Sequence, residues 1–250
     1  MTYLTSAALA LAFALGGGCL SFGQPPNWRS FESGLLGRDV EYAVHAAGDP
    51  APTGVVYITD GRKWAERGLL NYLDSLHSTH TALPPTTYVL VSTIDPATGE
   101  DVRERFFDCD GPGARFFTEE FVPHVERDRP LASAAASRVL VGASFGAMSA
   151  AALSAEPDSP FGVYVLLSPI TFQCPGLLER IAFLEGAAAK TRRAFVTTGT
   201  HDAEVYAEPL AAMYAAVGVE AHYVHTEGGH EFATWFAVLG DALAWALETR

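Results

Sequence analysis

The sequence predicts one α/β domain with a mostly parallel, doubly wound sheet and helices on both faces. Short apolar runs alternate along the chain with longer segments of helical periodicity, which is the pattern of repeated strand–helix units. The 250 residues are 49% hydrophobic and 18% charged, which suits a single substantial core. No internal repeat interrupts the pattern, so we expect one domain over residues 24–250.

The predicted strands are short runs rich in aliphatic, aromatic and Thr residues, and Gly or Asp follows several of them. The first run alternates, with Val40, Tyr42 and Val44 on one face. The later runs are nearly continuous in apolar residues, as strands buried on both faces of a sheet are. The expected strands span residues 40–45, 54–60, 87–94, 139–141, 161–167, 194–198 and 220–225.

The predicted helices separate these strands and repeat apolar residues every three or four positions. In the first helix, Leu69, Leu73 and Leu76 have this spacing. The stretch 95–113 is rich in Asp, Gly and Arg and predicts a long loop. The expected helices span residues 64–76, 114–126, 147–155, 177–186, 204–217 and 230–247.

Charge and cysteine content exclude several classes of partner. The formal net charge is −13 and the pI is near 4.9, so nucleic acid and anionic membrane surfaces are not expected to bind. The three cysteines have no paired spacing typical of zinc ligands. We therefore expect neither a metal site nor an organic cofactor.

Residues 1–23 differ from the rest and predict a signal peptide or a lipoprotein signal. Residues 4–15 are apolar, as the core of a signal peptide is, and Cys19 follows three glycines as at a lipoprotein cleavage site. Residues 1–3 carry no basic side chain, and Gly16 stands where that signal usually has Leu. We expect export to the periplasm, the outside or a lipid anchor. The alternative is an ordinary N-terminal helix on a cytoplasmic protein.

The stretch from Arg138 to Ala150 combines an apolar strand, a Gly-Ala-Ser-Phe-Gly turn and a small-residue helix. Ser144 at the apex, with Gly two residues away on each side, is the pattern of a nucleophile elbow. Side chains at either Gly position would collide with the strand or the helix. The alternative is a chance match, but the strand before and the helix after favour a nucleophile.

A serine nucleophile needs a base, and the base needs an acid that orients it. Asp202 and His230 follow the next strands in the expected order, Ser then Asp then His, at the same edge of the sheet as Ser144. Glu204 is the alternative acid, and Asp202 could instead cap a helix. His230 could be an exposed loop residue, but Gly228 and Gly229 let its loop turn toward Ser144.

An oxyanion hole needs two convergent N–H groups. Phe145, directly after the nucleophile, is expected to supply the first. The second is expected from Arg62, with Gly61 next, in the loop after residues 54–60. The alternative is that this loop is only a turn and Asp60 a helix cap.

Several of these motifs, in this order, resemble the enterochelin-esterase-like branch of the α/β-hydrolases, which is related to feruloyl esterases, S-formylglutathione hydrolases and mycolyltransferases. The resemblance runs from about Phe31 to the C-terminus. It implies the α/β-hydrolase fold and places the family's roles on Ser144, Asp202 and His230. The motifs that carry it are Asp60-Gly61 with Trp64, Arg103-Glu104-Arg105, Phe121-Val122-Pro123, Gly-Ala-Ser-Phe-Gly-Ala, and Gly228-Gly229-His230 with Trp235.

We therefore expect a serine carboxylic-ester hydrolase that acts on a small-molecule ester through an acyl-enzyme intermediate. Siderophore esters and aryl or feruloyl esters are the expected substrate classes. Trp64, Arg103 and Arg105 are candidates for substrate contacts. The alternatives are acyl transfer to an alcohol and an inactive hydrolase fold that only binds.

The cations Arg62, Lys63, Arg103 and Arg105 are expected on loops at the catalytic edge, where they could attract anionic acids. The alternative is that they pair with Asp108 and Asp110.

Cys109 and Cys174 lie in loops on either side of the elbow strand, at the same edge of the sheet. We expect a disulfide between them if the protein is exported. The alternative is two buried thiols.

Overall fold

The computed structural model describes residues 25–49, 52–80, 83–109, 111–127, 131, 135–184, 189, 191–202 and 207–248. The predicted signal, residues 1–23, lies outside the described residues, and so do Asp110 and Glu204. Within the described ranges, no helix is both long and apolar enough to cross a membrane.

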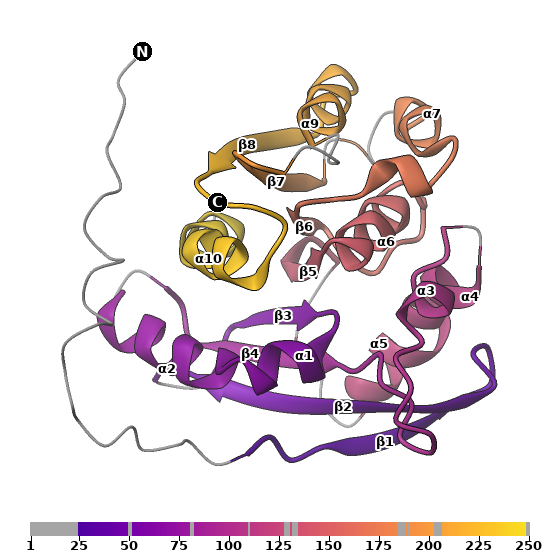
Figure 1. Cartoon of the computed structure of the whole chain (residues 1–250), viewed down its shortest axis with the longest axis vertical. Helices are drawn as coiled ribbons and strands as arrows, with labels where there is room; N and C mark the ends of the chain where they lie inside the picture. Colours follow the sequence, from indigo (N-terminus) through magenta and orange to yellow (C-terminus); the bar gives the residue numbers. More distant parts are fainter. Residues whose placement is uncertain are drawn as a thin grey trace.

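In the described part of the chain, eight strands form one sheet in the order β1-β2-β4-β3-β5-β6-β7-β8 (Figure 1). Strand β2 pairs antiparallel with both β1 and β4. All the other neighbours in the sheet, from β4-β3 to β7-β8, are parallel. The prediction of a mostly parallel α/β sheet is confirmed. The strands are β1 Arg29–Ser33, β2 Arg38–Ala47, β3 Gly54–Ile58, β4 Thr86–Val91, β5 Arg138–Ala143, β6 Val163–Leu167, β7 Arg193–Gly199 and β8 Glu220–Thr226.

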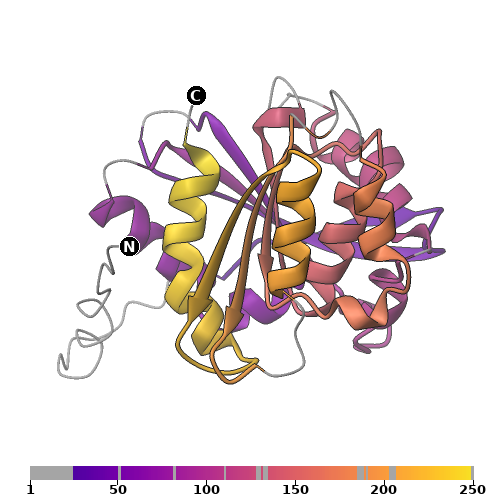
Figure 2. The same ribbon diagram turned by 90° about the horizontal axis from the view of Figure 1, so that it is seen from above.

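Helices cover both faces of this sheet. Helices α1, α2 and α10 contribute to one core cluster, and α6, α7 and α9 contribute to the other. In Figure 2 the strands pass between the yellow helix α10 and the orange helix α9. The helices are α1 Gly61–Glu66, α2 Leu69–Thr79, α3 Arg103–Phe106, α4 Pro112–Arg115, α5 Val122–Val125, α6 Phe145–Ser154, α7 Leu177–Ala182, α9 Ala207–Ala216 and α10 Phe232–Leu247, with the π-helix η1 Phe116–Phe121 and the 3-10 helices η2 Ala135–Ser137 and η3 Thr171–Gln173.

The structure differs from the sequence prediction in four elements. Strand β1 was not predicted, because its sequence Arg-Ser-Phe-Glu-Ser is mostly polar, as an edge strand can be. The single helix predicted over 64–76 is two helices, separated at Gly68, whose φ is 87°. The predicted loop 95–113 contains α3 and the start of α4. The helix predicted over 114–126 is a π-helix through its middle.

The alternation of side chains along each strand fills the two cores. In β3, Val55 and Tyr57 face the α6 side, whereas Val56 and Ile58 face the α10 side. All four are buried. The parallel strands end at one edge of the sheet, and the loops that follow β3, β5, β7 and β8 carry the predicted site residues.

Candidate active site

Ser144 lies in the tight turn between β5 and α6, the strand–turn–helix unit that the sequence predicts. Its backbone has φ 58° and ψ −119°, a region that residues with a side chain rarely adopt. Its N–H donates to the carbonyl oxygen of Leu167 at the end of β6, at 2.9 Å. A Cβ on Gly142 would lie closer than 3.0 Å to the backbone of Gly146. The turn therefore depends on glycine at this position.

His230 lies between Ser144 and Asp202. Its Nε2 is 2.8 Å from Ser144 Oγ, and its Nδ1 is 3.1 Å from each carboxylate oxygen of Asp202. The Asp202 side chain is 1% exposed and the imidazole 35%. A carboxylate on Nδ1 favours the tautomer with the proton there, which leaves Nε2 free to accept from the serine hydroxyl.

The loops that carry the acid and the base are hydrogen-bonded to each other. The N–H of Thr200 donates to the carbonyl of Thr226, and the N–H of His201 donates to that of Gly228, both at 2.9 Å. The hydroxyl of Thr200 accepts from the N–H of Gly228 at 3.3 Å. Asp202 and His230 are thus held together by the backbone as well as by their side chains.

An aromatic cluster packs against the imidazole of His230 through Trp235. The ring of Trp235 lies edge-on to the imidazole, with centroids 5.4 Å apart, and its Nε1 donates to Ser168 Oγ at 3.0 Å. Trp64 packs in turn against Trp235, Phe232 and Phe236. In the sequence, Gly228-Gly229-His230 and Trp235 serve only as part of the family resemblance, so the packing of Trp235 against His230 was not predicted.

Trp64 was wrongly predicted to contact substrate. Its side chain is completely buried in α1, within the core on the α10 side of the sheet. The helical turn that begins at Gly61 directs it inward. A residue in this position acts through packing, because substrate cannot reach it.

The two predicted oxyanion-hole residues lie at the starts of helices. Phe145 is the first residue of α6, and Arg62 is the second of α1. Amides in the first turn of a helix have no intrahelical acceptor, so both suit the predicted role. The Arg62 side chain forms an ion pair with Glu41, and its Cζ lies 4.8 Å from the centroid of the Trp28 ring. The hole itself stays a prediction.

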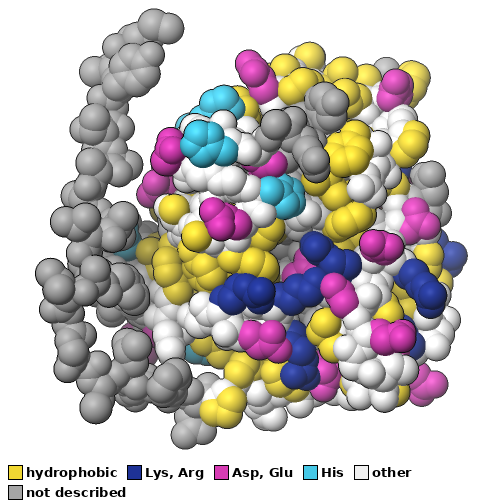
Figure 3. Space-filling view, viewed as in Figure 1, with side chains coloured by type: hydrophobic (Ala, Val, Ile, Leu, Met, Phe, Trp, Pro, Cys, Tyr) yellow, Lys and Arg dark blue, Asp and Glu magenta, His cyan; other side chains and the backbone are white. Residues whose placement is uncertain are grey.

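Three of the cations at this edge pair with carboxylates of Glu41, Asp60 and Asp101. Arg62 pairs with Glu41, Lys63 with Asp101 at 2.5 Å, and Arg103 with Asp60 at 3.0 Å. In Figure 3 a band of Lys and Arg side chains crosses the middle of the face, with acidic side chains beside it.

Asp101 shows the effect of such a pair on a titrating group. Burial is the largest cause and raises its pKa, but the hydrogen bond and charge of Lys63, together with hydrogen bonds from the Arg103 N–H and the Thr93 hydroxyl, lower it more, so its pKa lies below the ordinary value. The expectation of a free cationic surface is therefore wrong for Arg62, Lys63 and Arg103. Arg105 is exposed in α3.

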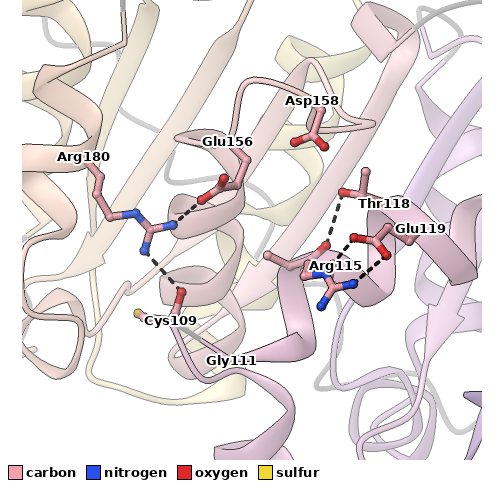
Figure 4. A pocket seen from close by; sticks show the side chains of 9 residues that line it. Cys109, Gly111, Arg115, Thr118, Glu119, Glu156, Asp158 and Arg180 are labelled. Carbon is pink, nitrogen blue, oxygen red and sulfur yellow. Dashed lines mark hydrogen bonds and ion pairs between the residues drawn. The ribbon is translucent and has the colours of Figure 1, made fainter. Parts of the chain in front are cut away.

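Cys109 and Cys174 form a disulfide that joins the segment between α3 and α4 to the segment before α7. Arg180 reinforces this junction, because its guanidinium donates to the carbonyl of Cys109 at 3.2 Å and to Glu156 at 2.5 Å (Figure 4). A groove of about 530 Å³ lies beside it. Glu156 in its lining follows the end of α6 that is remote from Ser144, so the groove is separate from the triad.

Among the described residues, no group of three or more His, Cys, Asp or Glu side chains is placed to hold a metal ion.

The amino-acid sequence is similar to that of a curated enterobactin esterase. It is 25% identical over 240 residues to the iron(III) enterobactin esterase of Dickeya dadantii (strain 3937), a match that covers 88% of this chain and 54% of the relative. The chain thus spans about half the length of the curated relative it matches. No protein-family model matches the chain.

Solved structures share the fold. The enterobactin esterase of Shigella flexneri, solved in the presence of enterobactin, matches with a TM-score of 0.77 and 22% identity over 90% of this chain and 59% of that one. A ferulic acid esterase matches with a TM-score of 0.72 and 18% identity over 88% of this chain and 96% of that one. The resemblance predicted from the motifs is confirmed: the chain has the α/β-hydrolase fold, and its sequence is similar to that of an enterobactin esterase.

Proposed function

We propose that this protein is a serine carboxylic-ester hydrolase. The observation that carries the proposal is the hydrogen-bonded series from Ser144 Oγ through the imidazole of His230 to the carboxylate of Asp202. Each group has the neighbour that its role requires. The esterases among its relatives support the same reaction class.

In the proposed reaction, Ser144 Oγ attacks the ester carbonyl while His230 Nε2 takes the serine proton. Asp202 holds the imidazole and stabilises the positive charge that it gains. The amides of Phe145 and Arg62 donate to the oxyanion of the tetrahedral intermediate. His230 then returns the proton to the leaving alkoxide, and the acyl group stays on Ser144. A water molecule, deprotonated by His230, releases the acid in the second half of the reaction.

We propose two candidate substrate classes, aryl or feruloyl-type esters and the lactone esters of a siderophore. The relatives, an enterobactin esterase and a ferulic acid esterase, support this choice. The two classes differ in both the acyl and the alcohol portion, and the shape of the site decides between them.

We also propose that the protein acts in an oxidising compartment. The Cys109–Cys174 bridge supports this, because structural disulfides persist mainly outside the cytoplasm. The prediction of a signal in residues 1–23 agrees with it.

The test is hydrolysis of p-nitrophenyl esters, methyl ferulate and a trilactone siderophore by the wild type, Ser144→Ala and His230→Ala. We expect each variant to lower kcat about 10³-fold or more, and the double variant to lose no more than one single variant does. Ser78→Ala, an exposed serine at the end of α2, is the matched control.

Two results would contradict the proposal. The first is that the folded wild type hydrolyses none of the esters. This result would favour the alternative, an inactive hydrolase fold that only binds. The second is activity that survives in Ser144→Ala. Added alcohols separate hydrolysis from acyl transfer, because a transferase would form the new ester faster than the free acid.

A further inference from the structure

We propose that Arg103 is a positioning residue that holds the two halves of the oxyanion hole at a fixed separation. The inference rests on the proposed function, because it assigns a role within that reaction. Arg103 belongs to the short helix α3, between β4 and β5 in the chain, and contacts the loop that follows β3 and the last residue of β5.

One guanidinium group reaches both segments. Its Nη2 is 3.0 Å from Asp60 Oδ2 and 3.5 Å from the carbonyl oxygen of Ala143, and its Cζ is 5.3 Å from the centroid of the Phe145 ring. Ala143 and Phe145 are the two neighbours of Ser144 in the chain. Asp60 directly precedes Gly61 and Arg62, which carry the second expected amide. Arg103 therefore contacts residues on both sides of the hole.

Asp60 itself is held in an unfavourable backbone conformation. Its φ is 54° and its ψ 31°, in the left-handed region, and its side chain is 3% exposed. Its carboxylate has Arg103 on one oxygen, with Thr93 Oγ1 at 3.1 Å and Lys63 Nζ at 3.4 Å on the other. These contacts stabilise a conformation that sets the direction of the next amides, as strained backbone at functional sites requires.

The two loops also touch directly. A Cβ on Gly146 would lie closer than 3.0 Å to Thr59 Oγ1 and 3.2 Å from Asp60 Oδ2. A shift of Asp60 would therefore press on the first turn of α6 and move the Phe145 amide. Because Arg103 is paired with a carboxylate, its charge is largely cancelled at Ser144. Geometry is what the residue supplies.

The test compares an oxoester with the thionoester of the same acid and alcohol. The larger sulfur with its longer C=S bond fits the hole poorly, so hole geometry contributes mainly to the oxoester rate. For Arg103→Met we expect kcat on the oxoester to fall about 10- to 100-fold, KM to change less than about threefold, and the thionoester rate to change little. The ratio of the oxoester rate to the thionoester rate therefore falls.

Two further variants separate position from charge and stability. Arg103→Lys keeps a positive charge for Asp60 but lacks the planar guanidinium that lies over the Phe145 ring. It should therefore fold and lower the ratio of the oxoester rate to the thionoester rate only partly. Asp60→Asn removes the ion pair from the other side. The double variant with Arg103→Met should lose less than the two single losses combined, since the contact between Arg103 and Asp60 is common to both, whereas Asp60→Asn also removes the pair with Lys63. Arg115→Met, which breaks an exposed pair with Glu119, is the matched control and should leave the ratio unchanged.

Equal loss on both esters, or no loss on either, would overturn the role of Arg103 and leave the proposed function standing. If the wild type is inactive or Ser144→Ala retains activity, the proposed function fails, and this inference fails with it.

Discussion

A Cβ on Gly199 would lie closer than 3.0 Å to the carbonyl oxygen of Gly228. Gly199 ends β7, three residues before Asp202, and Gly228 lies two residues before His230. The loop of the acid and the loop of the base therefore meet backbone against backbone. No larger residue fits at Gly199 without separating them.

Replacing Gly199 by Ala should separate the acid from the base. The added methyl group must displace the loop of residues 226–230, so the hydrogen bond between Asp202 and His230 lengthens. We expect kcat to fall about tenfold or more and the free energy of unfolding to fall by about 1–3 kcal/mol. Steady-state kinetics and urea unfolding measure the two effects.

The matched control is Gly229→Ala in the same loop. A Cβ there meets nothing within 4 Å, and its φ is not in the left-handed region. This variant should stay close to the wild type in both measurements. Equal effects at Gly199 and Gly229 would contradict the importance of the contact.

The sheet and the triad could be predicted because their signals are local. Buried strands are visible as apolar runs, and parallel strands end at one edge, so Ser144, Asp202 and His230 could be brought together without side-chain detail. The glycines around Ser144 follow from the sharpness of one turn. These inferences need only the strand order along the chain.

The partners of Arg103 and Trp64 could not be predicted, because they lie far away in sequence. Arg103 contacts Asp60 and Trp64 contacts Trp235, and in both pairs the residues come from different strand–helix units. A charged or aromatic residue near a catalytic loop looks like a substrate contact until its neighbours are known. Complete burial argues against a substrate contact for Trp64, whereas for Arg103 the substrate contact stays a prediction.

Trp64→Phe tests whether Trp64 is a core residue. The indole is buried, and its Nε1 has no hydrogen-bond partner among the described residues. Replacement by Phe leaves a cavity beside Trp235 but removes an unsatisfied donor. We expect a loss of about 1–3 kcal/mol in the free energy of unfolding, with KM unchanged. A raised KM at unchanged stability would restore the interpretation as a substrate contact.

The disulfide should be a main source of stability. Cys109 and Cys174 are 65 residues apart, so removing the bridge should lower the free energy of unfolding by about 4 kcal/mol by chain entropy. Urea unfolding of Cys109→Ser/Cys174→Ser measures this loss, and reduced wild type is the control that should match it.

Thiol titration of the unfolded, unreduced chain counts the free thiols and so tests for the bridge. The chain has three cysteines, so the bridge leaves one free thiol, that of Cys19, or none if residues 1–23 have been removed. Two or more free thiols would contradict the bridge and weaken the proposal of an oxidising compartment.

His77 should make the fold sensitive to acid. Burial lowers its pKa, the charge of Asp74 raises it, and His45 lowers it further, so the pKa in the folded protein lies below its ordinary value. Its Nε2 is 2.9 Å from the hydroxyl of Tyr88, whose own pKa burial raises, so that hydroxyl stays protonated and can donate to neutral His77. When His77 is protonated, its Nε2 can no longer accept the hydrogen bond from the Tyr88 hydroxyl.

The sign of the pH effect follows from proton binding. Between the lowered pKa of the folded protein and the pKa near 6.5 of the unfolded chain, the unfolded chain binds more protons. Stability should therefore fall as pH falls below about 6.5.

His77→Gln keeps a side chain that can accept from Tyr88 but cannot titrate there. Urea midpoints measured from pH 7.5 to 5 should show a smaller slope in this variant. His201→Gln, whose native side chain is 74% exposed, is the control that should keep the slope of the wild type. Equal slopes in the wild type and His77→Gln would assign the acid sensitivity to other groups.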